Sequence, residues 1–163
     1  MILLSGSGRI GRTCRTAPNG SAAPGIRNGV QKNMIIVDTD ILIDAAREIE
    51  DAVNCLRQIE DKSSPAISAV TQMELIIGCR NKKELKSLEH FLKGFKLISL
   101  NKQISDTAAD LLKTYRLSHG LLIADALIAA TAIVTGNPLI SKNRKDCRFI
   151  QELGLLEYPV EDL

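Results

Sequence analysis

The sequence contains few of the residues that mark several common classes of protein. Tryptophan is absent and aromatic residues make up 3% of the 163 residues, which argues against the aromatic stacking surfaces of many modules that bind single-stranded RNA. The four cysteines form no CxxC pair, and the two histidines lie near none of them. The pattern therefore predicts neither a zinc site nor a disulfide framework, and it is typical of a reducing cytoplasm.

Long apolar segments are also scarce. The longest nearly uncharged run covers residues 121–134 and contains Asp125. A helix that spans a bilayer needs roughly 20 apolar residues, so no segment is predicted to cross a membrane and this run is expected to form a core helix. With 45% hydrophobic and 25% charged residues, the chain can bury an ordinary, mostly aliphatic core, and its length fits one domain.

Residues 1–33 differ in composition from the rest of the chain. They hold five basic residues and no acidic one, together with six of the eleven glycines. Such a segment cannot bury enough apolar surface to offset its chain entropy, and it lacks the apolar stretch of roughly 7–15 residues of a secretory signal. We expect a disordered basic arm, or translated sequence ahead of a true start at Met34, followed by one folded domain over residues 34–163.

From Met34 onward, short apolar runs alternate with segments of helical periodicity. The runs expected to form strands cover residues 34–37, 66–70, 95–100, 139–140 and 155–160. The segments with helical spacing cover residues 40–46, 51–61, 72–80, 82–93, 101–119 and 121–135, and Thr71 is the expected cap of the third. This alternation predicts an α/β sandwich of three layers, in which helices flank a mostly parallel sheet of about four to five strands.

Acidic residues follow the ends of the first two predicted strands. Asp38 comes directly after the first strand, and Glu74 lies in the first turn of the helix that follows the second. Ligands of open parallel sheets bind beyond the carboxyl ends of the strands, so both residues are candidates for a site. Each also has a structural explanation, because Asp38 or Asp40 can cap a helix and the helix dipole favours Glu74 near an N-terminus.

Asp125 is the only charged residue of the apolar helix predicted over residues 121–135. Burying an unpaired carboxylate costs several kcal/mol, which indicates a cation, a base or a mechanism at this position. The alternatives are an ion pair with Lys or Arg, or a raised pKa that keeps the carboxyl neutral. Asn143 and Asp146 follow the strand predicted at 139–140, in a loop rich in Lys and Arg that is otherwise typical of a solvated surface.

Several carboxylates at one edge of a sheet repel each other unless a cation neutralises them. Oxygen ligands without His or Cys suit Mg²⁺ or Mn²⁺, and such an ion activates bound water and stabilises charge on a phosphate. Hydrolysis of phosphodiester bonds is therefore the predicted reaction class. Lys142, Arg144 and neighbouring basic residues are expected to hold the polyanion.

Four segments together resemble the PIN domain, and most of all the VapC-type toxin ribonucleases of bacterial toxin–antitoxin pairs. They are IIVDTDILI at 35–43, ISAVTQMELIIG at 67–78, IADALIAATA at 123–132 and LISKNRKD at 139–146. The resemblance covers essentially all of residues 34–163. It implies an endoribonuclease dependent on Mg²⁺ or Mn²⁺, an inhibitory antitoxin partner, a homodimer, and products with 5′-phosphate and 3′-hydroxyl ends.

The resemblance also implies roles for individual residues. It makes Asp38, Glu74 and Asp125 the acidic residues of the metal site, with Thr39 as the hydroxyl beside the first of them. In the mechanism that it implies, Asp38 and Asp125 hold the metal. Glu74 and Asp146 complete the acidic cluster or orient the attacking water.

The chain departs from the family's pattern in the last of the four segments. The fourth acid of the family varies in placement, and here Asn143 occupies one common position and Asp146 another. Ser141 stands where threonine is common, which keeps a hydroxyl group, and Cys147 stands where an aromatic residue is common. We expect Ser141 and Asn143 to support the site, whichever residue completes it.

Two other readings of the sequence are open. Val-Asp-Thr-Asp at 37–40 also resembles the nucleophile motif of haloacid-dehalogenase phosphatases, in which Asp38 would attack phosphorus, and a receiver-like phosphoacceptor is related to that reading. However, those families place their last acids in loops, whereas Asp125 is predicted within a helix. The other reading is a non-catalytic PIN scaffold that binds RNA or protein, against which the presence of Asp38, Glu74 and Asp125 argues.

Overall fold

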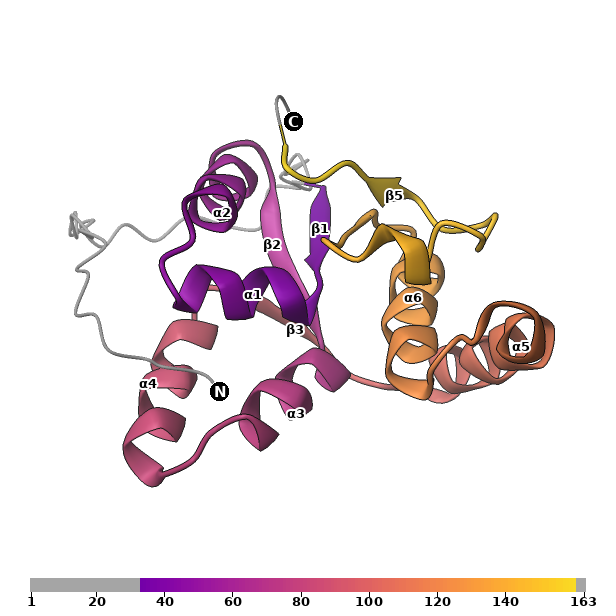
Figure 1. Ribbon diagram of the computed structural model, residues 1–163, viewed down its shortest axis with the longest axis horizontal. Helices are drawn as coiled ribbons and strands as arrows, with labels where there is room; N and C mark the ends of the chain where they lie inside the picture. Colours follow the sequence, from indigo (N-terminus) through magenta and orange to yellow (C-terminus); the bar gives the residue numbers. More distant parts are fainter. Residues whose placement is uncertain (1–32, 161–163) are drawn as a thin grey trace, which may run out of the picture.

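The computed structural model describes residues 33–160 (Figure 1), so the expectation for the basic segment 1–33 falls almost wholly outside the described residues. Five strands form one sheet in which every pair is parallel, in the order β3-β2-β1-β4-β5. The strands are β1 Met34–Val37, β2 Ser64–Ser68, β3 Lys96–Ile98, β4 Leu139–Ile140 and β5 Leu155–Leu156. The predicted parallel sheet of an α/β fold is confirmed.

Six α-helices connect the strands within the described residues. They are α1 Thr39–Ala46, α2 Glu50–Lys62, α3 Ala69–Ile77, α4 Lys82–Leu92, α5 Lys102–His119 and α6 Ile123–Thr135, and a short 3₁₀ helix, η1, covers Arg144–Asp146. None of these helices is both long and apolar enough to cross a bilayer.

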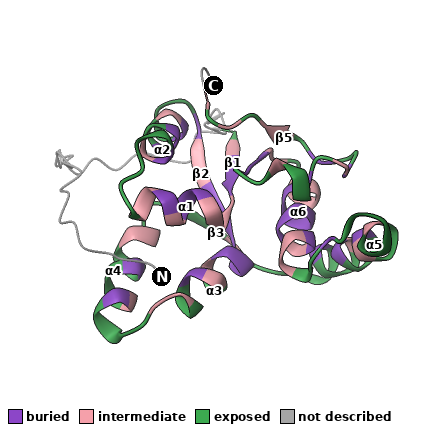
Figure 2. Ribbon diagram, in the orientation of Figure 1, coloured by how far each residue is buried: buried purple, intermediate pink, exposed green. Residues whose placement is uncertain are grey.

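The helices cover both faces of the sheet. Successive strand residues point to opposite faces, and apolar residues of β1 are buried on each face. Ile36 packs into a core shared with α5 and α6, whereas Ile35 and Val37 pack into a second core with α1 and α2. Figure 1 shows these two pairs of helices on opposite sides of β1, and Figure 2 shows that their buried residues lie on the sides that face the strands. The result is the predicted sandwich of three layers with an aliphatic core.

Helix α3 begins earlier than the sequence predicted. The prediction that Thr71 caps a helix from residue 72 was wrong, because the Ser68 hydroxyl accepts the backbone N–H of Val70 at 3.2 Å and the helix starts at Ala69. The second strand was expected to extend to Val70, but the strand pairing ends at Ser68. Glu74 consequently lies beyond the first turn of α3, not within it.

Helix α6 begins later than predicted, at Ile123. Gly120 adopts a left-handed conformation, with φ of 78°, and Leu121 and Leu122 lead from it into the helix, with Leu122 extended as its N-cap. Asp125 therefore lies in the first turn of α6 and is partly exposed. Asp125 thus lies within the predicted helix, but near its start, and it is not the fully buried carboxylate that the sequence predicted.

Candidate functional site

The sheet order creates a switch point between β1 and β4. From β1 the chain passes to β2 on one side, while β4 lies on the other side of β1. Connections that leave neighbouring strands in opposite directions open a crevice at their carboxyl ends, where ligands of parallel sheets bind. The backbone N–H of Asp38 donates to the carbonyl of Ile140 at 3.0 Å, so Asp38 and Ser141 enter this crevice side by side.

Asp38 lies at the carboxyl end of β1 and caps α1. Its carboxylate accepts the backbone N–H of Thr39 at 2.7 Å and the hydroxyl of Ser141. Burial raises the pKa of Asp38 to about 6, and the charges of Asp40 and Asp125 add to this rise, while the two hydrogen bonds oppose it. Asp38 therefore both caps α1 through its bond to Thr39 and places a carboxylate in the crevice.

Thr39 connects the first and second acidic segments. Its hydroxyl donates to Oε2 of Glu74 at 2.5 Å, which ties α3 to the residue that follows Asp38. Glu74 is partly buried, and the hydroxyl fixes one of its oxygens beside the crevice. The predicted supporting role of Thr39 therefore has a geometric basis in its contact with Glu74.

Asp125 and Asp146 form the other side of the acidic region. The pKa of Asp125 is raised by burial and then by the charges of Asp146 and Glu74. Asn143 donates its side-chain amide to Asp146. Both residues that could complete the acidic set are consequently joined to each other, and Asp146 is the one whose charge acts on Asp125.

Two further carboxylates on α1 hold the loop that follows β4. The Asp40 carboxylate accepts the backbone N–H groups of Ile41 at 2.7 Å, Asn143 at 3.0 Å and Lys142 at 3.4 Å. The Lys142 ammonium reaches Asp44, whose side chain is only 12% exposed, at 2.5 Å. This role was not predictable from the sequence, although Asp40 and Asp44 lie one helical turn apart beside Asp38, because their partners come from about 100 residues away.

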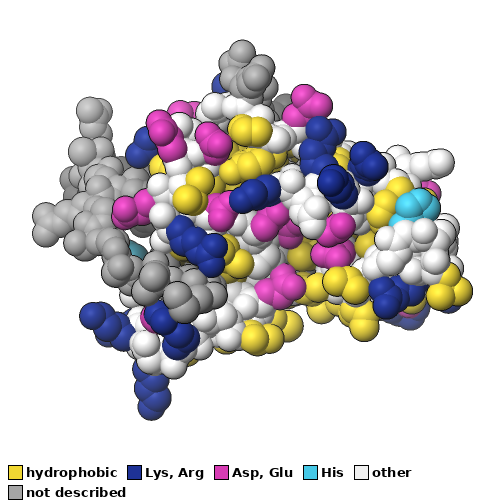
Figure 3. Space-filling view, viewed as in Figure 1, with side chains coloured by type: hydrophobic (Ala, Val, Ile, Leu, Met, Phe, Trp, Pro, Cys, Tyr) yellow, Lys and Arg dark blue, Asp and Glu magenta, His cyan; other side chains and the backbone are white. Residues whose placement is uncertain are grey.

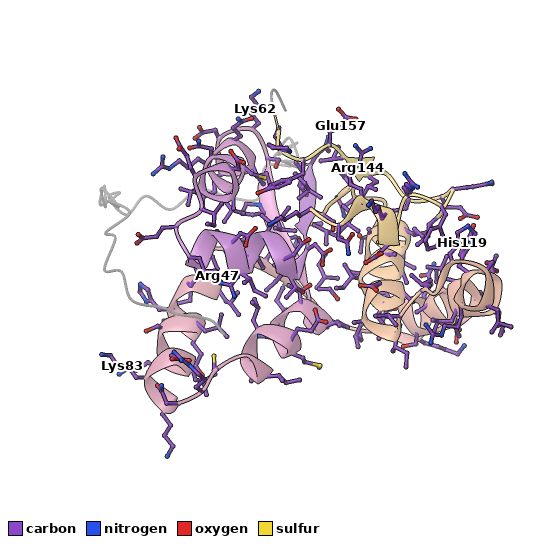
Figure 4. The ribbon with its side chains drawn as sticks, in the orientation of Figure 1. Arg47, Lys62, Lys83, His119, Arg144 and Glu157 are labelled. Carbon is purple, nitrogen blue, oxygen red and sulfur yellow. The ribbon has the colours of Figure 1, made fainter. Side chains whose placement is uncertain are left out.

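Arg144, which was expected to hold a polyanion, is paired with an acid. Its Nη1 lies 3.2 Å from an oxygen of Glu157, and Figure 4 labels both residues near β5. The side chains are 43% and 84% exposed, and an ion pair of such exposure contributes roughly 0–1 kcal/mol. A polyanion can therefore compete for Arg144, and likewise for the half-exposed Lys142.

The donor chemistry of this region fits a divalent cation. Figure 3 shows acidic side chains gathered near the middle of one face, with basic side chains beside them. Among residues 33–160, no three His, Cys, Asp or Glu side chains lie close enough together to form a preformed metal site. Nevertheless, Asp38 and Asp125 offer carboxylate oxygens, which Mg²⁺ and Mn²⁺ prefer. The pKa values of both are raised first by burial and then by neighbouring carboxylates, and a bound cation would favour the ionised form of each.

Comparison with known proteins identifies the class to which this fold and site belong. The model of the PIN domain family matches residues 35–150, and the chain belongs to that family. This assignment confirms the resemblance and excludes the haloacid-dehalogenase alternative. The roles of the individual acids remain a prediction.

The chain is homologous to VapC ribonucleases. It is 31% identical over 130 residues to Ribonuclease VapC1 of Methanocaldococcus jannaschii, and the aligned segment covers 78% of this chain and 89% of that protein. It is also 35% identical over 111 residues to Ribonuclease VapC10 of Mycobacterium tuberculosis, and the aligned segment covers 68% of this chain and 83% of that protein. Among solved structures, it is similar to a toxin–antitoxin complex from Klebsiella pneumoniae, with a TM-score of 0.64, 28% identity, and coverage of 79% of this chain and 99% of that chain.

Proposed function

We propose that this protein is a metal-dependent endoribonuclease of the VapC type, a toxin that a cognate antitoxin neutralises. The observation that carries the proposal is that acids from four separate segments gather at one edge of the sheet. The hydroxyl of Thr39, next to Asp38, donates to Glu74, Asp125 and Asp146 line the same cavity, and the charges of Asp146 and Glu74 add to the rise in the pKa of Asp125 that burial causes. The homology to VapC ribonucleases supports the same reaction.

In this proposal, Asp38 and Asp125 hold Mg²⁺ or Mn²⁺, and Glu74 completes the set. The bound ion would lower the pKa of a water molecule and stabilise charge on the phosphate. Ser141 keeps the Asp38 carboxylate oriented through its hydroxyl, and Thr39 does the same for Glu74. These hydrogen bonds leave further carboxylate lone pairs for the ion.

Glu74 and Asp146 would orient the attacking water and accept its proton. A water positioned by Glu74 or Asp146 gives up a proton to one of these carboxylates and attacks phosphorus. The bond from phosphorus to the 3′ oxygen breaks, and that oxygen takes up a proton, which leaves 5′-phosphate and 3′-hydroxyl ends. Lys142 is 55% exposed in its pair with Asp44, and Arg144 is 43% exposed in its pair with Glu157, so both would be accessible to the flanking phosphates.

The partners proposed are an antitoxin protein and a second copy of this chain. The similar structure from Klebsiella pneumoniae is a toxin–antitoxin complex. Helix α3 also exposes three large apolar side chains, Met73, Ile76 and Ile77, which are 52%, 43% and 82% exposed. An apolar patch of this kind is typical of a surface that another protein covers.

Incubation of the purified protein with total cellular RNA tests the proposed function. New 5′ ends should appear with Mg²⁺ or Mn²⁺, disappear with EDTA, and be absent with Asp125→Asn. A chromogenic phosphate monoester should not be hydrolysed. RNA that binds to the protein but acquires no new ends under any divalent ion would instead support a non-catalytic PIN scaffold and overturn the proposal.

A further inference from the structure

A small cavity adjoins the acidic region on the side of α5. Its volume is about 140 Å³, and Asp125 and Asp146 form one part of its lining. The rest of the lining comes from the segment that joins α5 to α6, namely His119, Gly120, Leu121 and Leu122. The proposed hydrolysis uses the two acids, but it assigns no task to the other four residues.

The His119 ring is held in a fixed orientation although the residue is exposed. It stacks on Phe149 with ring centroids 4.2 Å apart and planes 23° apart, and the Tyr115 ring lies at 71° to it with centroids 5.8 Å apart. Its Nδ1 also lies 2.8 Å from the Ser118 hydroxyl. Figure 4 shows His119 between α5 and the segment that follows β4. A ring held in this way loses little conformational freedom when another flat group docks against it.

Leu122 gives the cavity a second apolar wall. Its side chain is 57% exposed, and the backbone around it is held in place because Nη1 of Arg116 donates to the carbonyl of Gly120 at 2.8 Å. An apolar side chain and a flat ring suit a planar, uncharged group. The lining provides no Lys or Arg side chain that would bind a phosphate, so the part of the cavity between His119 and Leu122 suits a base better than a phosphate.

We propose that this cavity binds the base of a nucleotide next to the scissile phosphate, with the base stacked between His119 and Leu122. This inference rests on the proposed ribonuclease function. The carboxylates of Asp125 and Asp146 place the reaction beside the cavity, and a base adjoining the reacting phosphate lies within one nucleotide of them. One such platform is also consistent with the scarcity of aromatic residues, since a single stacked base needs a single ring.

The test combines changes in the RNA with changes in the protein. An RNA that carries a cleavage site mapped in total RNA is synthesised with an abasic residue at each position that flanks the cleaved bond, one position at a time. Stacking of one base contributes roughly tenfold to kcat/KM, so the unaltered protein should cut one abasic RNA about tenfold more slowly. His119→Ala should cut the abasic RNA and the unaltered RNA at about the same rate. His119→Phe keeps a ring at this position and should again cut the abasic RNA about tenfold more slowly than the unaltered RNA.

A matched control separates this role from a general structural effect. Leu117 lies on the same helix and is 98% exposed but does not line the cavity, so Leu117→Ala should keep the full abasic penalty. If His119→Ala retains that penalty, or if no position shows one, the base site is overturned while the ribonuclease proposal stands. If the unaltered protein cuts no RNA, the proposed function fails and this inference fails with it.

Discussion

Replacing Asp38 by asparagine should stabilise the protein at neutral pH in the absence of divalent ions. Burial raises the pKa of this carboxyl from its usual 3.8 to about 6, so the folded state disfavours the ionised form. One pKa unit corresponds to about 1.4 kcal/mol, and the ionised group therefore lowers the free energy of unfolding by up to about 3 kcal/mol. Asparagine removes the charge and is an equally good helix cap, so α1 keeps its N-terminal hydrogen bond.

The sign of the pH dependence follows from the raised pKa. Above about pH 6, Asp38 is ionised in both the folded and the unfolded chain, and the full penalty applies. As the pH falls toward 3.8, the folded protein takes up a proton while the unfolded chain remains ionised, so the penalty shrinks. Below pH 3.8 both states are protonated and no penalty remains.

Thermal unfolding in EDTA from pH 4 to pH 7.5 measures this effect. The melting temperature of Asp38→Asn should exceed that of the unaltered protein by several degrees, up to about 10 °C, at pH 7.5. The two values should converge at pH 4. Asp51 lies in the first turn of α2 and is exposed, so Asp51→Asn serves as the control and should change stability by less than about 0.5 kcal/mol. An Asp38→Asn protein that melts lower than the unaltered one at pH 7.5 would refute the reasoning.

Three further predictions concern the rest of the site and the fold. Mg²⁺ or Mn²⁺ should raise the melting temperature of the unaltered protein, because a ligand of the folded state stabilises it by mass action, and Asp125→Asn should lose that shift in differential scanning fluorimetry; equal shifts in both proteins would count against the site. Lys142→Met leaves the nearly buried Asp44 carboxylate without its partner, so urea unfolding should show a loss of about 1–2 kcal/mol, most of which Asp44→Asn in the same chain restores. Asn81→Ala removes a side chain that accepts two backbone N–H groups at the start of α4 and should cost about 1 kcal/mol by the same measurement.

The sheet was predictable because its strands are short, apolar and separated by helical segments. Met34–Val37 reads as a buried strand from its own residues, and burial on both faces is what a central parallel strand requires. The order of the strands was not predictable in the same way. The position of β1 between β2 and β4, which creates the crevice beside Asp38, depends on pairing between segments about 100 residues apart.

The ends of the helices were less predictable than their existence, and the two errors have different causes. Ser68 and Thr71 are both good helix caps, and only the end of the strand pairing decides between them. Leu121 and Leu122 continue an apolar run into α6, but the left-handed Gly120 turns the chain so that both residues lie outside the helix. Periodicity records which residues are apolar, and it does not record where the backbone starts to coil.

The different tasks of the acids follow from how much of each carboxylate the protein itself uses. A carboxylate has about four sites for accepting hydrogen bonds. Asp40 accepts three backbone N–H groups, so its oxygens are largely occupied in holding the loop after β4. Asp125 accepts the backbone N–H of Leu122 and otherwise faces the negative charges of Asp146, Glu74 and Asp40. Because its oxygens are largely unused and its surroundings are acidic, Asp125 gains from a cation, whereas Asp40 already has its partners.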